Sequence, residues 1–126
     1  MEPKGMSTVL LVEDSITDSK RLTRYLQQSG LTVVSVGSVE EAQEKLNQLT
    51  PDLVVLDIIL PGQSGFELCF ELKTNPGTVA IPVVICSSKG AEGDKLWGNL
   101  VGADAYLPKP VDQQQLVRTV QQLIKK

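Results

Sequence analysis

Histidine is absent from the 126 residues of this sequence. Its absence excludes a Ser-His-Asp hydrolase, a histidine-ligated zinc site and a phosphohistidine carrier, because each of these needs an imidazole. Aromatic residues make up only 4% of the chain, too few for a platform that stacks single-stranded nucleic acid. The 12 basic and 15 acidic residues give a net charge of −3 without blocks of like charge, so no nucleic-acid-binding face is expected.

Long apolar runs are also missing. No run approaches the roughly 20 residues needed to cross a bilayer, and Met1–Met6 has no apolar stretch that would serve as a secretory signal. We expect residues 1–7 to form a short tail. Cys69 and Cys86 lie within apolar runs, which favours buried free thiols in a reducing compartment over a disulfide or a metal site. These features predict a cytoplasmic protein without a membrane segment.

Short β-rich runs alternate with segments of helical periodicity along the rest of the chain. The predicted strands are Thr8–Val12, Leu31–Val36, Leu53–Leu56, Val83–Cys86 and Ala105–Leu107. The predicted helices are Ile16–Ser29, one that begins at Ser38, Gln63–Thr74, Ala91–Val101 and one capped by Asp112. Repeated strand–helix units give parallel strands joined by right-handed crossovers. We therefore expect residues 8–126 to form one α/β domain with an open, doubly wound parallel sheet.

Several residues mark where these elements begin and end. Ser38–Glu41 has the pattern of a capping box, and Gly30 is expected to end the first helix. Asp112 is a typical N-cap. Pro108 and Pro110 cannot donate backbone hydrogen bonds, so their position predicts that the fifth strand lies at an edge of the sheet.

Polar residues follow the predicted strands, where open α/β sheets bind their ligands. They are Glu13, Asp14, Asp57, Ser87 and Lys109. Each has an ordinary explanation by itself. Glu13 and Asp14 could be acids at a helix start, and Asp57 could be a turn residue before Pro61. Ser87 could cap a helix, and Lys109 could be a solvated lysine. A shared site at one edge of the sheet explains all of them together.

The chemistry of such a site follows from its charges. Three carboxylates about 5 Å apart repel by about 3 kcal/mol per pair at an effective dielectric constant of about 20, so they raise one another's pKa or bind a cation. Oxygen ligands without histidine favour Mg²⁺ completed by water. Lys109 and Ser87 suit the oxygens of an incoming phosphoryl group. Asp57, central among the strands, is then the predicted nucleophile, and the metal and Lys109 offset its desolvation.

Four segments resemble a known family in order and spacing. They are LLVEDS, VVLDIILPGQSGFEL, IPVVICSS and GADAYLPKPV. From Thr8 to its C-terminus the chain closely resembles the receiver domain of two-component response regulators. The resemblance implies a flavodoxin-like fold with five parallel strands in the order 2-1-3-4-5 and five helices.

The resemblance also implies roles for the polar residues. Asp57 is the implied phosphoacceptor, Asp14 binds Mg²⁺ directly, and Glu13 binds it mainly through water. The backbone carbonyl of Ile59 is a further implied metal ligand. Lys109 is the implied phosphate-binding lysine, and the Lys109-Pro110 peptide is expected to be cis.

A switch between two states is a second implication. A partner histidine kinase donates the phosphoryl group, and the phosphoryl oxygens draw in Ser87. The movement of Ser87 leaves space that Tyr106 can enter from outside. The changed surface then docks to a downstream target. Without the resemblance, Tyr106 would be interpreted as a half-exposed aromatic of an edge strand. Ile59 and Lys89 stand where the family modulates phosphate lifetime. Because an apolar Ile59 cannot orient an attacking water, slow self-dephosphorylation is predicted.

The sequence indicates less about the downstream role of the chain than about its chemistry. We expect no output domain after Lys126, which would be typical of free-standing, chemotaxis-type regulators. The segment KGAEGDKLWGNLVGADAYLPKPV resembles the group associated with twitching motility and phototaxis. Trp97 within it is either a docking anchor or a partly buried helix aromatic. A monomer or weak dimer is expected.

Four other functions share some of these sequence features. A metal-dependent phosphatase with an aspartyl nucleophile needs a second acid two residues later, where this chain has Ile59. A flavodoxin-like cofactor binder needs glycines in the first turn, which VEDSIT lacks. A pseudo-receiver that is never phosphorylated is disfavoured by the intact polar set. A receiver that serves only as a phosphate sink stays open.

Overall fold

The computed structural model describes residues 7–58, 60, 64–87 and 101–124, with Ser87 described by its backbone alone. Five parallel strands form one sheet in the order β2-β1-β3-β4-β5, as the sequence predicts. The strands are β1 (Thr8–Val12), β2 (Thr32–Val36), β3 (Leu53–Asp57), β4 (Val83–Ser87) and β5 (Ala105–Pro108). The helices are α1 (Ile16–Gln28), α2 (Val39–Gln48), α3 (Gly65–Thr74) and α5 (Gln113–Ile124). The helix predicted over Ala91–Val101 lies outside the described residues up to position 100.

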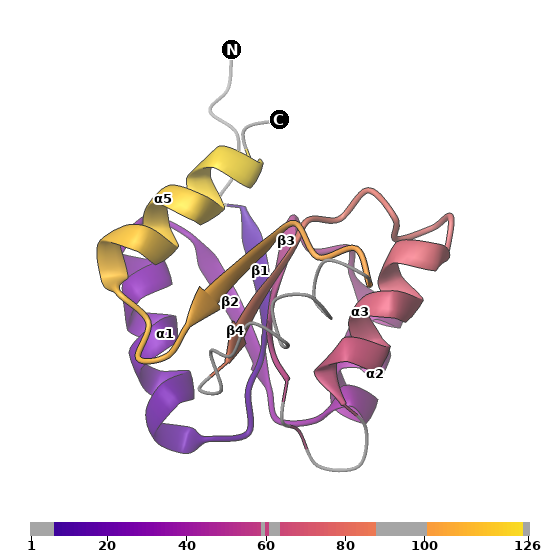
Figure 1. Cartoon of the computed structure of the whole chain (residues 1–126), viewed down its shortest axis with the longest axis horizontal. Coiled ribbons are helices and arrows are strands. Elements are labelled where there is room, and N and C mark those ends of the chain that lie inside the picture. Colours follow the sequence, from indigo (N-terminus) through magenta and orange to yellow (C-terminus); the bar gives the residue numbers. More distant parts are fainter. Residues whose placement is uncertain (1–6, 59, 61–63, 88–100, 125–126) are drawn as a thin grey trace.

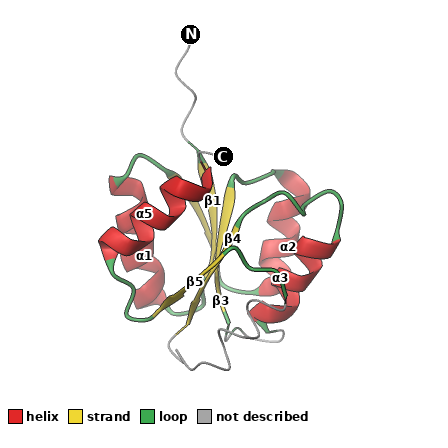
Figure 2. Ribbon diagram, turned by 45° about the horizontal axis from the view of Figure 1, so that its top comes forward, coloured by secondary structure: helices red, strands yellow, loops and turns green. Residues whose placement is uncertain are grey.

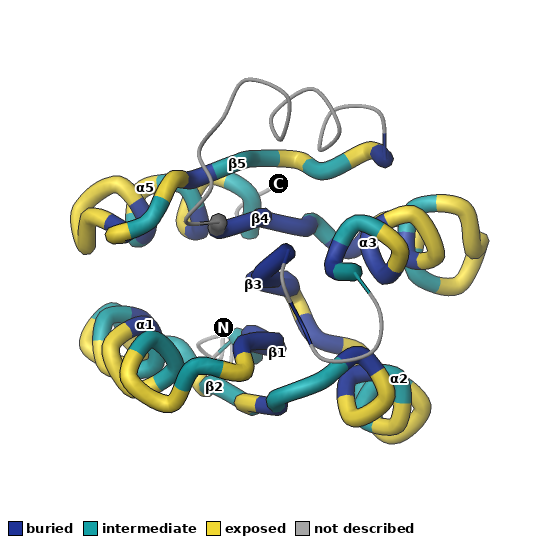
Figure 3. The backbone as a smooth tube through the Cα atoms, turned by 60° about the horizontal axis from the view of Figure 1, so that its bottom comes forward, coloured by how far each residue is buried: buried dark blue, intermediate teal, exposed yellow. Residues whose placement is uncertain are grey.

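The sheet is covered on both faces (Figures 1 and 2). Helices α1 and α5 lie on one face, and α2 and α3 lie on the other. Successive residues of β1 point alternately into the two layers: Val9 and Leu11 pack with α1 and α5, whereas Leu10 and Val12 pack with α2 and α3. Since both faces are buried, Val9–Val12 of β1 and Leu53–Leu56 of β3 are apolar at consecutive positions rather than at every second one. Both stretches are buried throughout (Figure 3).

The two edge strands are β2 and β5. Thr32 and Ser35 of β2 are exposed, and β5 ends with the exposed Pro108. A proline is tolerated there because the outer side of β5 has no neighbouring strand in the sheet, so the edge position predicted for β5 is confirmed.

Local capping sets the helix starts. The Ser38 hydroxyl accepts a hydrogen bond from the Glu41 N–H at 3.2 Å, which confirms the predicted N-cap of α2. The Glu41 carboxylate accepts from Gly37 N–H at 2.8 Å, one residue before the N-cap position that a capping box uses. Asp112 accepts from the Gln115 N–H at 2.9 Å and caps α5 as predicted.

Small differences concern the ends of elements. Helix α1 ends at Gln28, one residue before the predicted end, and Gly30 follows with a φ of +86°. Helix α3 begins after Ser64, whose hydroxyl accepts from the Phe66 N–H at 3.0 Å. The predicted start of that helix, Gln63, lies outside the described residues.

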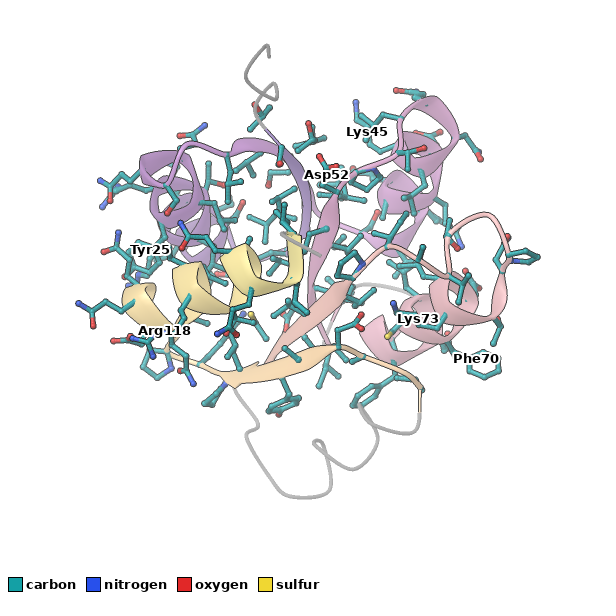
Figure 4. The ribbon with its side chains drawn as sticks, turned by 90° about the horizontal axis from the view of Figure 1, so that it is seen from above. Tyr25, Lys45, Asp52, Phe70, Lys73 and Arg118 are labelled. Atoms are coloured by element: carbon teal, nitrogen blue, oxygen red, sulfur yellow. The ribbon has the colours of Figure 1, made fainter. Side chains whose placement is uncertain are left out.

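At the amino end of the sheet, Lys73 joins α3 to the strands. Its ammonium lies 2.8 Å from the Asp104 carboxylate and donates to the Ile81 carbonyl at 2.7 Å. The same Asp104 oxygen accepts from the Val83 N–H at 2.8 Å, where β4 begins. Figure 4 labels Lys73 together with Phe70, which points away from the ribbon and is 54% exposed. Lys73 is therefore a structural connection at the end of the sheet opposite the predicted site.

Both cysteines are buried and free, as predicted. Burial raises the pKa of Cys69 to about 11 and that of Cys86 to about 12. Among the described residues, no helix has the length and apolar character needed to span a membrane.

Candidate functional site

The carboxyl ends of three strands bring four predicted side chains together. Glu13 and Asp14 directly follow β1, Asp57 is the last residue of β3, and Lys109 follows β5. One oxygen from each of the three carboxylates lies within 4.8 Å of the others. Neighbouring parallel strands end at the same edge, which is why residues so distant in the sequence meet here.

Two of these carboxylates are withdrawn from water. Glu13 and Asp57 are the buried charged residues among those described, with exposed fractions of 4% and 8%, whereas Asp14 is exposed. A buried carboxylate without a partner is strongly unfavourable. The Lys109 ammonium, 2.6 Å from Glu13 and 3.5 Å from Asp57, supplies the opposite charge that both need.

The sequence did not identify Asp18, a further acid at this site. Its carboxylate lies 3.0 Å from the Lys109 ammonium. Burial by itself would lower the pKa of Lys109, but hydrogen bonds to Glu13 and Asp18, together with the charge of Asp57, raise it above its usual value. One signal could have found Asp18: it stands in the first turn of α1, next to the end of β1.

The cluster of Glu13, Asp14 and Asp57 has three carboxylates, more negative charge than the single ammonium of Lys109 balances. Burial raises the pKa of Glu13, as does the charge of Asp57, while hydrogen bonds from Lys109 and from the Ser15 N–H oppose that rise. Oxygens bound directly to Mg²⁺ lie at most about 4.2 Å apart, so a cluster of this size suits an ion that keeps some water ligands. Carboxylate oxygens alone are the donors that a hard divalent cation prefers, and the cluster therefore fits Mg²⁺.

Gly65 determines how closely α3 approaches the site. Its N–H donates to the Ile58 carbonyl at 2.8 Å. A Cβ atom at Gly65 would overlap the carbonyl oxygen of Asp57 and lie 2.9 Å from its carbonyl carbon. A side chain at Gly65 is thus excluded by the backbone that carries Asp57, a constraint that the sequence by itself does not reveal.

Comparison with protein families matches residues 9–121 to the response regulator receiver domain. The chain belongs to this family. It is 38% identical over 115 residues to protein PilH of Pseudomonas aeruginosa, covering 91% of this chain and 95% of PilH. The match confirms the resemblance to a receiver domain of two-component systems and extends over most of both chains.

Solved structures agree with this assignment. One from Chloroflexus aurantiacus J-10-fl, described as a response regulator, is 31% identical with a TM-score of 0.93 over 96% of this chain and 99% of that chain. The Mn²⁺-bound form of the response regulator Rcp1 is 29% identical with a TM-score of 0.79 over 93% of this chain and 91% of that chain. The flavodoxin-like arrangement expected for this receiver domain is therefore confirmed.

Tyr106 is partly buried in this receiver domain. Its side chain packs against the core between the sheet and helices α2 and α3. The hydroxyl oxygen is buried and has no hydrogen-bond partner among the described residues. The sequence predicted a half-exposed ring, or one that enters from outside after phosphorylation. The structure shows a ring of intermediate exposure whose hydroxyl is covered, and its movement after phosphorylation stays a prediction.

Several predicted positions of the receiver domain lie outside the described residues. They are Ile59, Lys89, Trp97 and the side chain of Ser87. The predicted carbonyl ligand, lifetime modulators, docking residue and switch hydroxyl therefore stay predictions. The Lys109-Pro110 peptide is cis, as the resemblance implies.

Proposed function

We propose that this receiver domain, residues 8–126, accepts a phosphoryl group on Asp57 from a partner histidine kinase in a Mg²⁺-dependent reaction. One observation carries the proposal: the buried Asp57 carboxylate forms an acidic cluster with Glu13 and Asp14, which suits a cation, and it lies 3.5 Å from the Lys109 ammonium. A nucleophile that must receive a highly charged group needs positive charge on both sides. The chain acts as a phosphoacceptor that promotes only its own phosphorylation and dephosphorylation.

Each residue has a part in the transfer. An Asp57 oxygen attacks phosphorus as the bond between phosphorus and the donor histidine nitrogen breaks. The Lys109 ammonium neutralises phosphoryl oxygens, and the Ser87 hydroxyl donates a hydrogen bond to them. Lys109 is protonated through the physiological pH range, because its pKa is raised above its usual value.

The metal ligands in this proposal are Asp14, Asp57 and the Ile59 carbonyl, with Glu13 acting mainly through water. When bound, Mg²⁺ supplies positive charge that shields Asp57 from the phosphoryl oxygens. The all-oxygen donor set supports this choice. The similarity to Rcp1, whose structure holds Mn²⁺, gives further support.

The signal is carried by a change of surface. Movement of Ser87 toward the phosphoryl group alters the packing around Tyr106, and the altered face docks to a target protein, with Trp97 as a candidate anchor. Ile59 and Lys89 set the lifetime of the phosphorylated form. Tyr106 is partly buried, and its hydroxyl has no hydrogen-bond partner within the described part of the chain; this supports a role as an element with two arrangements.

Motility or taxis is the pathway we propose. The resemblance of KGAEGDKLWGNLVGADAYLPKPV to the twitching-motility and phototaxis group supports it, as does the similarity to PilH. We place the protein in the cytoplasm, as a monomer or weak dimer that engages a kinase and a target. A phosphate sink, which accepts the group without engaging a target, is the alternative.

Small-phosphodonor labelling tests the biochemistry. The full chain is incubated with acetyl phosphate and Mg²⁺ and analysed by intact mass. We expect a phosphate-sized gain in the wild type and none in Asp57→Asn. Asp52→Asn is a matched control, because Asp52 is an exposed acid that accepts from the Thr8 N–H at the other end of the sheet; it should retain the gain. A wild type that gains nothing would indicate a pseudo-receiver.

A further inference from the structure

Asp18 contributes to the site but has no part in the mechanism above. Three carboxylates surround the Lys109 ammonium, at 2.6 Å (Glu13), 3.0 Å (Asp18) and 3.5 Å (Asp57). Glu13 and Asp57 belong to the metal-type cluster, whereas Asp18 does not. Lys109 therefore has one partner that a cation in the cluster would leave free.

The ammonium and a divalent cation compete for the same charges. Lys109 neutralises Glu13 and Asp57, two of the three carboxylates that a cation would use. A cation in the cluster also repels the ammonium, which is almost buried with 11% of its side chain exposed. Cation binding thus weakens two of the three ion pairs that keep Lys109 in place.

The N-terminus of α1 fixes the position of Asp18 beside Lys109. The backbone N–H of Asp18 donates to the Ser15 hydroxyl at 3.2 Å, the N-cap contact of α1. The first turn of a helix favours an ionised carboxylate. Because Glu13 and Asp18 flank this cap, one short segment presents two carboxylates to Lys109, one inside the cluster and one outside it.

We infer that Asp18 is a positioning residue for Lys109: it retains the ammonium at the edge of the site when a divalent cation takes over Glu13 and Asp57, and it thereby strengthens cation binding. The inference rests on the Mg²⁺ site of the proposed function and deepens it. Without Asp18, Lys109 keeps only partners inside the cluster, and the cation must displace it from them.

A double-mutant cycle tests the inference. Mg²⁺ affinity is measured by calorimetry on the full chain, with Asp18→Asn and Asp18→Glu each placed in the wild-type and Lys109→Met backgrounds. We expect Asp18→Asn to weaken binding about 3- to 10-fold in the wild type and less than about twofold beside Lys109→Met, since residues in contact show coupled effects. Asp18→Glu keeps the charge, so its affinity should stay within about twofold of the wild type in both backgrounds.

Two results would overturn the inference. An equal loss of affinity in both backgrounds would mean that Asp18 acts on the cation through its charge alone. No loss in the wild-type background would leave Asp18 as a structural connection between α1 and the segment after β5. Circular dichroism shows whether each variant folds.

A crystal structure of the Mg²⁺-bound wild type provides a test that needs no variant. We expect the Lys109 ammonium to stay within about 3 Å of Asp18, a hydrogen-bonding distance, and to move away from Glu13. Separation from Asp18 would overturn the inference. A wild type that binds no Mg²⁺ would overturn the proposed function as well, whereas binding without the coupling would overturn this inference alone.

Discussion

The backbone of Gly65 lies against the backbone of Asp57, so closely that a methyl group on Gly65 would overlap the Asp57 carbonyl oxygen. This contact joins the first residue of α3 to the last residue of β3, and the Gly65 N–H donates to the adjacent Ile58 carbonyl at 2.8 Å. The position of the proposed phosphoacceptor thus depends on how closely a helix can approach a strand.

The substitution Gly65→Ala is expected to destabilise the protein by about 1–3 kcal/mol, because an inserted methyl group forces backbone shifts in a packed region. Phosphoryl acceptance from acetyl phosphate should also slow, since Asp57 moves. Urea unfolding and labelling rates measure the two effects. Gly37→Ala is the control: among the described residues, its Cβ would meet only the Glu41 carboxylate, at 3.9 Å. Its effect should stay within about 1 kcal/mol. Equal effects of the two substitutions would contradict the contact.

Replacing Lys109 with methionine leaves Glu13 and Asp57 buried without their shared ammonium. Removal of one partner from a buried ion pair lowers the free energy of unfolding by about 3–5 kcal/mol, and we expect the lower end of that range because the third partner of Lys109, Asp18, has 33% of its side chain exposed. Mg²⁺ should stabilise Lys109→Met more than the wild type, because the ammonium no longer competes with it. Urea unfolding with and without Mg²⁺ measures this, and equal gains for both proteins would argue against competition.

Burial of Cys86 gives the stability of the fold a dependence on alkaline pH. The pKa of this thiol is raised from 9.0 to about 12, so above pH 9.0 the unfolded chain releases a proton that the folded chain retains. The stability that comes from this thiol is fully present below pH 9.0 and declines above it, by at most about 1.4 kcal/mol per pH unit. Cys86→Ala should therefore lose less stability than the wild type between pH 9.0 and the raised pKa. Parallel losses in urea unfolding across this range would refute the assignment.

Lys73 offers a test at the other end of the sheet. Lys73→Met removes an ion pair of 2.8 Å to Asp104 and a hydrogen bond of 2.7 Å to the Ile81 carbonyl. We expect a loss of about 2 kcal/mol in the free energy of unfolding, typical of hydrogen bonds to a charged group. Mg²⁺ affinity should be unchanged.

The matched control is Lys45→Met on α2, a position labelled in Figure 4. Its backbone carbonyl accepts from the Leu49 N–H at 2.9 Å, which the substitution keeps, and its side chain has no hydrogen bond or ion pair among the described residues. Its effect should stay within about 0.5 kcal/mol. A shift in Mg²⁺ affinity for Lys73→Met would show that the two ends of the sheet are coupled.

The lifetime prediction concerns Ile59. An asparagine at this position can orient a water for attack on the aspartyl phosphate, so Ile59→Asn should lose phosphate faster than the wild type. Ile59→Leu, which stays apolar, should decay at the wild-type rate. Stopped-flow measurement of the decay of the phosphorylated form compares the three proteins, and no acceleration with asparagine would refute the proposed role.

Much of the fold could be predicted because its signals are local. Continuous apolar runs identified the strands, and the side chains of Ser38 and Asp112 identified two helix starts. Residues that follow parallel strands must meet at one edge of the sheet, so the gathering of Glu13, Asp57 and Lys109 followed from the order of elements.

The sequence by itself determined the parallel α/β architecture and the chemical types of side chain at the ends of its strands, because periodicity, capping and strand–helix alternation are properties of neighbouring residues. Only the tertiary structure decided that Asp18 reaches Lys109, that Gly65 must lack a side chain, and that the hydroxyl of Tyr106 is covered. These contacts depend on atomic separations between segments as far apart as 91 residues, as for Lys109 and Asp18, and such separations are set by the packing of whole elements.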